Sequence, residues 1–218
     1  MKNKKIIFWA VDCQKDFIEK NGALYVEGAE IIKPNLRKLT EFAEKNNITV
    51  VNTKDHHHFS DEEISSKPDF INTFPPHCIV GSIGEEFVDE TKPENDSNII
   101  YYNDTPPTLE LLNRNIIICK NKFDVFTGNP YTEKFVEFIN PDITVVYGVA
   151  TNVCVNCAVL GLRKKGVEVI VVKDAIKKLP NIPVTEIYEK WDENQVGWID
   201  TDTLVNDLSS LIDARVIK

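Results

Sequence analysis

Apolar and polar positions are arranged in two ways along the chain. Short runs of β-branched residues are followed by longer segments in which apolar residues recur every three or four positions. The short runs predict buried strands and the longer segments predict amphipathic helices, a pattern typical of repeated βα units. The predicted strands span residues 5–12, 48–55, 115–120, 143–150 and 167–175, and the predicted helices span residues 31–46, 131–140 and 154–166.

The predicted strands are apolar at almost every position, as expected of parallel strands that helices cover on both faces. We therefore predict an α/β fold, a three-layer sandwich with a central, mainly parallel β-sheet. A chain of 218 residues can bury a good core as one unit, so we predict a single domain over residues 1–218. In such folds the functional residues gather beyond the carboxyl ends of the strands.

One segment interrupts the alternation. Residues 55–98 contain proline, glycine and acidic residues without a sustained period, and a stretch of that length is rarely an idle connection. We predict an insertion there that builds part of a site. The tail after Leu179 has a weakly helical stretch at residues 182–191 and a candidate last helix at residues 201–212, and no chemistry is assigned to it.

Charge and composition exclude several classes of protein. Acidic residues outnumber basic residues by 34 to 25, and no basic run with interleaved aromatic residues is present. This opposes binding to nucleic acid or an anionic membrane, so a small molecule is the expected partner. The basic start precedes an apolar run that meets Asp12 after six residues, which predicts a strand rather than an export signal. No other window approaches the roughly 20 apolar residues of a membrane-spanning helix.

The number and spacing of the cysteines indicate the cellular compartment. The chain has five cysteines, an odd number scattered through its length. Reduced thiols in a cytoplasm fit this usage better than a secreted disulfide framework does, so we expect a cytoplasmic protein.

Polar residues end four of the predicted strands. Asp12, Asp55 and Lys120 each close an apolar run, and the motif "GVATNVC" with Cys154 follows another. Because the carboxyl ends of parallel strands face one edge of the sheet, these side chains can converge there. The alternative is that each is an ordinary solvated residue between a strand and a loop.

Cys154 lies where a strand pattern stops and a helical pattern starts. A thiol in the first turn of a helix is near unpaired N–H groups and the positive end of the dipole, which favour the thiolate, and a nearby lysine would favour it more. The small residues before it permit a tight turn whose amides can hold an oxyanion. Cysteine is also a common small buried residue, and that reading fits Cys13, Cys78, Cys119 and Cys157.

Cys154 and Cys157 also form a C-x-x-C pair, which is typical of thioredoxin-like redox sites. The pair lies late in the chain, without the flanking aromatic residue and proline usual in those sites. Redox chemistry therefore stays a minor alternative.

Metal-ligating residues cluster in the insertion. In "TKDHHHFSDEE", Asp55 and His57 have a spacing that places both side chains on one side of an extended segment, and "TFPPHC" adds His77. One carboxylate and two imidazoles suit a divalent transition ion with open positions. A solvated polar cluster is the plain alternative, and an iron oxygenase site is a weaker one because those sites usually lie in a different, all-β fold.

With these residues assembled, the sequence resembles the isochorismatase-like cysteine hydrolases, and within them the nicotinamidase (pyrazinamidase) branch. The opening "VDCQKDF" is similar to the family motif V-D-x-Q-x-D-F, and "GVATNVCV" is similar to G-V-A-T-x-x-C-V. The resemblance covers most of the chain. It implies that Asp12 is the catalytic aspartate and Cys154 the nucleophile, and that a cis peptide bond before Ala150 helps the amides of Ala150 and Cys154 bind the oxyanion.

The resemblance also assigns the remaining site residues. In "CKNKFDVF", an ungapped match to K-x-x-[FY]-S-x-F selects Lys120 as the catalytic lysine, with Lys122 as the alternative, and Asp124 replaces the usual serine. The implied metal ligands are those already named. The implied aromatic walls of the substrate pocket are Phe74, where the family often has tryptophan, and Phe17.

The resemblance implies a metal-dependent amidohydrolase that converts nicotinamide to nicotinate and ammonia through a cysteine thioester, a step of NAD salvage. Zinc is the expected metal, with iron or manganese as alternatives, and a homo-oligomer is expected by analogy. Alternatives within the fold are another small-amide or carbamoyl hydrolase and a vinyl-ether hydrolase, which would lack the nucleophilic cysteine or the metal ligands. A catalytically idle binding protein is the alternative from another class.

Overall fold

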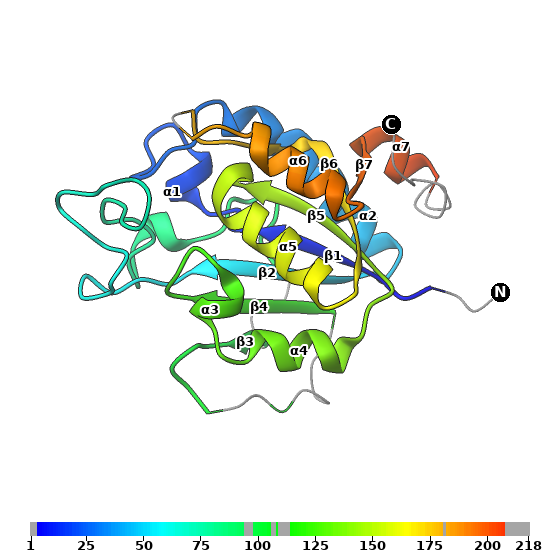
Figure 1. Ribbon diagram of the computed structural model, residues 1–218, viewed down its shortest axis with the longest axis horizontal. Helices are drawn as coiled ribbons and strands as arrows, with labels where there is room; N and C mark the ends of the chain where they lie inside the picture. The colour runs from blue at the N-terminus through cyan, green and yellow to red at the C-terminus, as the bar shows by residue number, and fades with distance from the viewer. Residues whose placement is uncertain (1–3, 94–97, 106–107, 109–113, 181, 208–218) are drawn as a thin grey trace.

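In the residues that the computed structural model describes, 4–93, 98–105, 108, 114–180 and 182–207, seven strands form one sheet (Figure 1). The strand order is β3-β4-β2-β1-β5-β6-β7, and each neighbouring pair is parallel. The strands are β1 (Ile6–Val11), β2 (Thr49–Asp55), β3 (Ile99–Ile100), β4 (Asn115–Lys120), β5 (Ile143–Val149), β6 (Glu168–Lys177) and β7 (Gly197–Ile199).

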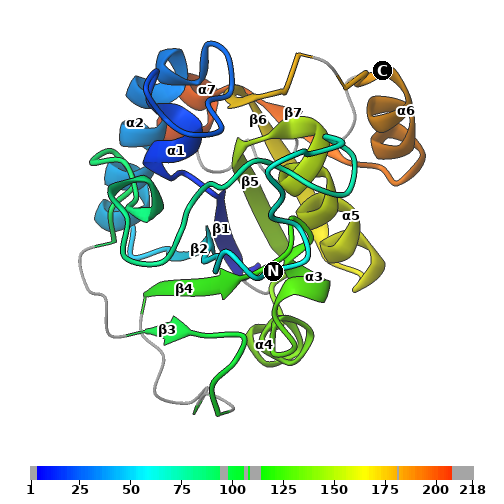
Figure 2. The same cartoon turned by 90° about the vertical axis from the view of Figure 1, so that its left-hand side faces the viewer.

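Helices cover both faces of this sheet (Figure 2). Side chains of β1 alternate between the two sides: Phe8 packs with the residues of one helical layer and Trp9 with those of the other, which explains why the strand is apolar throughout. The predicted three-layer α/β fold is confirmed. One layer holds α1 (Lys15–Ile18), α2 (Lys33–Lys45) and α7 (Thr201–Asn206), and the other holds α3 (Val125–Gly128), α4 (Thr132–Ile139), α5 (Asn156–Lys164) and α6 (Thr185–Glu193).

All five predicted strands and all three predicted helices are present, with ends that differ by a few residues. The sequence pattern missed β3, β7, α1 and α3, because elements of two to four residues are too short to display a period. The weakly helical stretch in the tail is α6. The candidate last helix begins as predicted at Thr201, and residues 208–212 lie outside the described residues.

The register of the sheet brings the ends of four strands to one edge. Asp55, the last residue of β2, is paired with Lys120, the last residue of β4, and Val11 of β1 is paired with Gly148 of β5. A Cβ atom at Gly148 would lie 2.1 Å from the carbonyl oxygen of Val11, so this close approach of β1 and β5 requires glycine. Asp12, directly after β1, has a positive φ of 47°.

The turns beyond these strands also follow from the sequence. The peptide bond between Val149 and Ala150 is cis, as the resemblance implied. One π-helical turn, Thr151–Val155, then leads into α5 and carries Cys154. Asp124 accepts a hydrogen bond from Phe126 N at 2.9 Å and caps α3, a task that serine performs equally well, so its departure from the family motif preserves the local structure.

No helix in the described part of the chain is both long and apolar enough to cross a membrane.

Candidate active site

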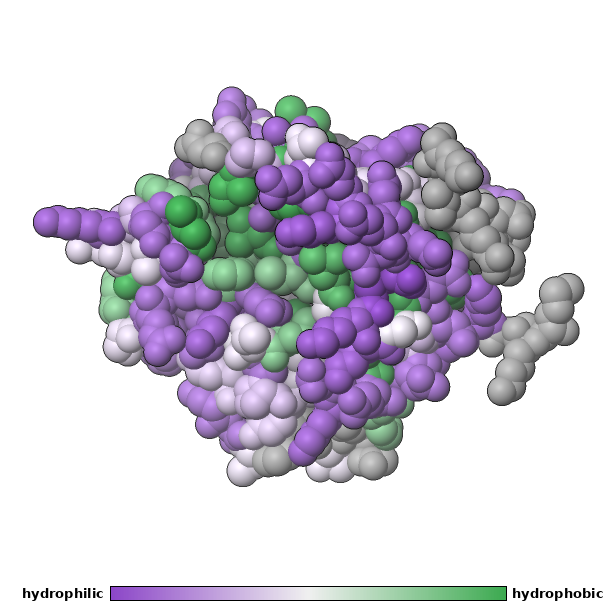
Figure 3. Space-filling view, in the orientation of Figure 1, coloured by the Kyte–Doolittle hydropathy of each residue, from purple (hydrophilic) through white to green (hydrophobic). Residues whose placement is uncertain are grey.

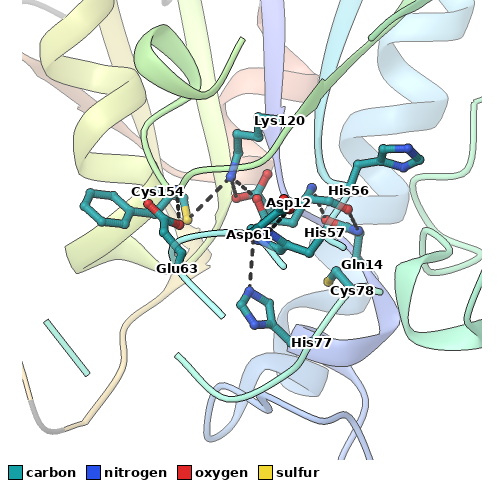
Figure 4. Close-up of polar contacts among 12 residues, drawn as sticks. Asp12, Gln14, His56, His57, Asp61, Glu63, His77, Cys78, Lys120 and Cys154 are labelled. Carbon is teal, nitrogen blue, oxygen red and sulfur yellow. Dashed lines mark hydrogen bonds and ion pairs between the residues drawn. The ribbon is translucent and has the colours of Figure 1, made fainter. Parts of the chain in front are cut away.

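Lys120 lies at the centre of a buried polar cluster (Figure 4). Its Nζ atom is 2.9 Å from Asp12 Oδ2 and 3.9 Å from Cys154 Sγ, and it also forms an ion pair with Asp55. We call Asp12, Lys120 and Cys154 the nucleophile centre. Asp12 lies more than one hundred residues before Lys120 and Cys154 in the chain, and the parallel sheet brings the three side chains together as the strand-end argument predicted.

A hydrogen-bonded partner fixes the orientation of Asp12. The hydroxyl of Thr53, on the neighbouring strand β2, donates to Asp12 Oδ1 at 2.5 Å and accepts from the Asp12 amide at 3.1 Å. Oδ2 is left with the Lys120 ion pair and has no hydrogen bond with standard geometry in the described residues. This oxygen is therefore the one available to take up a proton.

Burial dominates the ionisation of Cys154. It raises the pKa of the Cys154 thiol well above its ordinary value, and the Lys120 ammonium only partly opposes this. The sequence argument, which weighed the helix end and a lysine, expected a favoured thiolate; it missed the loss of hydration in a fully buried site. The resting form is thus a thiol, and a base must take its proton.

The carboxylates and the lysine stabilise one another's charges. Burial raises the pKa of Asp12, against the opposing effect of Lys120. For Asp55 burial acts in the same direction, but Lys120 and two imidazoles outweigh it and hold the pKa well below its usual range. Burial lowers the pKa of Lys120, whereas the two carboxylates raise it well above the ordinary value. Lys120 therefore stays charged at neutral pH.

A second cluster, Asp55, His57 and His77, adjoins the first, and we call it the metal set. Asp55 Oδ2 lies 3.8 Å from His57 Nε2 and 3.5 Å from His77 Nε2, and one ligand atom from each residue lies within 4.8 Å of the others. The three residues are buried. Asp55 links the metal set to the nucleophile centre, because its other carboxylate oxygen contacts Lys120.

The metal set fits a divalent transition ion. His77 Nδ1 lies 2.7 Å from the carbonyl oxygen of Pro75, and His57 Nδ1 lies 3.3 Å from Asp61 Oδ2, so both Nδ1 atoms have a partner for a ring proton. With the protons there, both Nε2 lone pairs would be available to an ion next to Asp55. His57 Nε2 is buried without a hydrogen-bond partner in the described residues, as expected of a ligand atom.

Residues of both clusters line one cavity: Cys154 of the nucleophile centre, and Asp55 and His77 of the metal set. In the space-filling view, hydrophobic residues gather around a hollow beyond the carboxyl ends of the strands (Figure 3). Phe17 and Phe74, the predicted substrate walls, both line the cavity, and the ring centroid of His77 is 5.3 Å from that of Phe17. Phe123 extends the aromatic wall, with its ring centroid 6.4 Å from that of Phe74. Ala150 also lines the cavity; the oxyanion role of its amide and that of Cys154 stays a prediction.

Sequence reasoning missed several polar residues at this site. Glu63 lines the cavity, accepts a hydrogen bond from Phe123 N at 2.8 Å, and has a pKa that burial raises to about 7. The side-chain amide of Gln14 pairs with both backbone groups of Asp55, at 2.8 Å each. The motif position of Gln14 was a usable signal, whereas Glu63, in an aperiodic loop, gave none.

The alternatives that the sequence left open were Lys122 as the catalytic lysine and Cys154 with Cys157 as a redox pair. The side chain of Lys122 is 41% exposed and pairs with Glu62, whereas that of Lys120 is 1% exposed. Cys154 and Cys157 are free thiols that line different cavities, one at the site and one between α3, α4 and α5.

A model of the isochorismatase domain matches residues 7–185. The chain belongs to the isochorismatase family. It is thus an isochorismatase-like hydrolase, as the sequence motifs indicated. A curated relative, the nicotinamidase/pyrazinamidase of Mycobacterium tuberculosis, is 35% identical over 77 residues. That match spans 35% of this chain and 40% of the relative.

Solved structures share the fold across nearly the whole chain. The pyrazinamidase of Pyrococcus horikoshii in complex with zinc has a TM-score of 0.69 at 24% identity, covering 90% of this chain and 99% of that one. The N-carbamoylsarcosine amidase of Thermoplasma acidophilum has a TM-score of 0.70 at 20% identity, covering 91% and 97%. At these identities the likeness establishes the fold of this chain.

Proposed function

We propose that this protein is a metal-dependent amidohydrolase that converts nicotinamide to nicotinate and ammonia through a thioester on Cys154. The observation that carries the proposal is the convergence of the Cys154 thiol, the Asp12 carboxylate and the Lys120 ammonium beside an apolar cavity that Cys154 lines. The curated relative is a nicotinamidase/pyrazinamidase, which supports this substrate class.

In the first step, Asp12 Oδ2 takes the proton of Cys154 as the sulfur attacks the carboxamide carbon. Because burial disfavours a free thiolate, proton transfer accompanies the attack rather than preceding it. Lys120 stabilises the charge that develops on the sulfur, and the amides of Ala150 and Cys154 are proposed to stabilise the oxyanion.

In the second step, the proton held by Asp12 moves to the amide nitrogen and the carbon–nitrogen bond breaks, releasing ammonia and leaving a thioester. Water then attacks the thioester with Asp12 as the base, which regenerates the thiol and releases the acid. The same carboxylate thus serves alternately as base and acid.

Asp55, His57 and His77 are proposed to hold a divalent ion, zinc first and iron or manganese as alternatives. Such an ion supplies Lewis acidity that orients a ring nitrogen or polarises a water molecule. The aromatic side chains of Phe17 and Phe74 suit a flat heteroaromatic ring.

The direct test is ammonia release from nicotinamide and pyrazinamide by enzyme loaded with zinc, manganese or iron. We expect activity in the loaded parent, loss after chelation, and loss in Cys154→Ala with its metal content unchanged. If the metal-loaded parent is inactive on both amides, the proposed substrate is wrong. If Cys154→Ala retains full activity, the proposed mechanism, in which Cys154 is the nucleophile, is wrong.

We further propose a cytoplasmic location, which five free cysteines support. A role in NAD salvage is proposed because it would follow from the hydrolysis of nicotinamide. The homo-oligomer expected from the resemblance is a separate proposal, which light scattering of the purified protein tests directly.

A further inference from the structure

The side chain of Asn152 ties the tail of the chain to the turn that carries Cys154. Its Oδ1 accepts a hydrogen bond from Leu179 N at 2.9 Å. Its Nδ2 donates to the carbonyl oxygens of Leu179 at 2.9 Å and Ile182 at 2.7 Å. The buried side-chain amide of Asn152 therefore binds both backbone groups of Leu179. Asn152 lies two residues before Cys154, the proposed nucleophile.

Leu179 lies at a point where the sheet no longer orders the chain. Strand β6 ends at Lys177, so the backbone groups of Leu179 have no ladder partner in the sheet. A bidentate amide is a suitable replacement, because it satisfies a donor and an acceptor at once and fixes their orientation. The position of Leu179 is thus set by Asn152 rather than by a strand.

The side chain of Leu179 lines the same cavity as Cys154. It lines this cavity together with Leu24, Val26 and Val153, and it packs against the apolar cluster on that side of the sheet. Leu179, which directly precedes the tail that the sequence left without a role, therefore supplies one wall of the site. The side chain of Asn152 links this wall to the turn that carries Cys154.

We propose that Leu179 sets the size limit of the cavity and that Asn152 is the positioning residue that holds Leu179 against the nucleophile turn. This deepens the proposed function, because the molecule whose size is limited is the amide that reaches Cys154. Truncation of either side chain should admit bulkier molecules. Asp12, Lys120 and the metal set touch neither residue in the contacts described above, so the chemistry at Cys154 should stay intact.

The first test uses alkylation of Cys154, which does not depend on amide turnover. Iodoacetamide is the small reagent and its N-phenyl derivative the bulky one, and the rate of each at Cys154 is followed by peptide mass spectrometry. In Leu179→Ala and in Asn152→Ala, the ratio of bulky to small rates should rise about tenfold, the lower end of the discrimination that small changes in an apolar pocket produce. The matched control is Asn194→Ala, which removes a similar bond to the carbonyl oxygen of Lys190, and its ratio should equal that of the parent.

Unchanged ratios in both variants would overturn the size limit. If the ratio of bulky to small rates rose in Leu179→Ala but not in Asn152→Ala, the positioning role of Asn152 would be wrong. Should Asn152→Ala not fold, Asn152→Asp replaces it, because it keeps the acceptor for Leu179 N and removes the donors to the carbonyl oxygens. The same ratio of alkylation rates then tests whether Asn152 positions Leu179. If Cys154 of the parent is alkylated normally but the parent does not hydrolyse nicotinamide, the proposed function is wrong, whereas the size limit set by Leu179 and Asn152 can still be correct.

The second test separates positioning from general damage. In Asn152→Ala, KM for nicotinamide should rise about tenfold while kcat changes little, and the relative kcat/KM for 5-methylnicotinamide should increase. The pH dependence of kcat should match that of the parent, because the nucleophile centre is untouched. A fall in kcat with unchanged KM and unchanged selectivity would contradict the proposal.

Discussion

The nucleophile centre and the metal set adjoin at Lys120, but different kinds of backbone hold them. Asp12 directly follows β1 and Lys120 ends β4, both paired strands, and Cys154 lies in the π-helical turn after β5. His57 and His77 lie in the insertion, where the backbone partners are isolated bridges and turns. Asp55, at the end of β2, is the only member of the metal set that the sheet positions.

This difference indicates a division of tasks. Groups that must meet within hydrogen-bond distance for proton transfer are placed by regular structure, whose geometry is fixed. The proposed imidazole ligands tolerate loop positions because a bound ion and a hydrogen-bonding partner, such as Asp61 or the Pro75 carbonyl, would orient each ring. Loss of a residue in the nucleophile centre should therefore affect folding and chemistry together, whereas loss of a loop ligand should affect mainly chemistry.

Lys120→Met should have the largest effect. It leaves Asp12 and Asp55 buried without their shared cation, so the free energy of unfolding should fall by about 3–5 kcal/mol and amide hydrolysis should drop by a factor on the order of 10³ or more. Urea unfolding and ammonia release measure the two effects. Lys122→Met is the matched control, and parental behaviour is expected of it. A Lys120→Met variant with the stability and activity of the parent would contradict the role assigned to Lys120.

His77→Ala should abolish metal binding and activity with a smaller loss of stability. Metal affinity should fall by more than the roughly 10- to 100-fold that follows loss of a ligand's hydrogen-bonding partner. Metal analysis after dialysis and unfolding of the metal-free protein separate the two effects. Asp61→Asn should give an intermediate loss of affinity. Equal zinc content in parent and His77→Ala would show that the proposed ligand set is wrong.

The strand-end groups also predict a pH effect. Asp12 must be ionised to act as base, and its pKa is raised by burial and lowered by Lys120 and by the Thr53 hydrogen bond. Thr53→Val removes a lowering influence, so the pKa rises further and kcat/KM should begin to fall at a pH about one unit higher on the acid side. Thr53→Ser keeps the hydroxyl and should retain the parental profile. A shift toward lower pH in Thr53→Val would contradict this assignment of the base.

The smallest effect is expected at Asp124. Asp124→Ala removes the cap of α3 and should lower the free energy of unfolding by about 1 kcal/mol, measured by urea unfolding. Asp124→Ser restores a capping side chain and should recover most of the loss. Equal stability of Asp124→Ala and the parent would mean that this departure from the family motif carries no structural role.

The contrast between the two clusters also explains what the sequence could predict. Strands are apolar over many residues, so the polar residues that end them, such as Asp12 and Lys120, are recognisable, and parallel pairing implies that they meet. Glu63 and Leu179 were not recognisable because no period or motif marks an aperiodic loop or a tail. The raised pKa of Cys154 depends on burial from all sides, which local sequence does not encode.

The central claim is that Cys154 carries the acyl group during turnover. The most direct measurement is mass spectrometry of metal-loaded enzyme quenched with acid during hydrolysis of nicotinamide. We predict a nicotinoyl group on the peptide that contains Cys154, absent from Cys154→Ser and from enzyme without substrate. Ammonia release with Cys154 unmodified throughout, and at an undiminished rate in Cys154→Ser, would contradict the account.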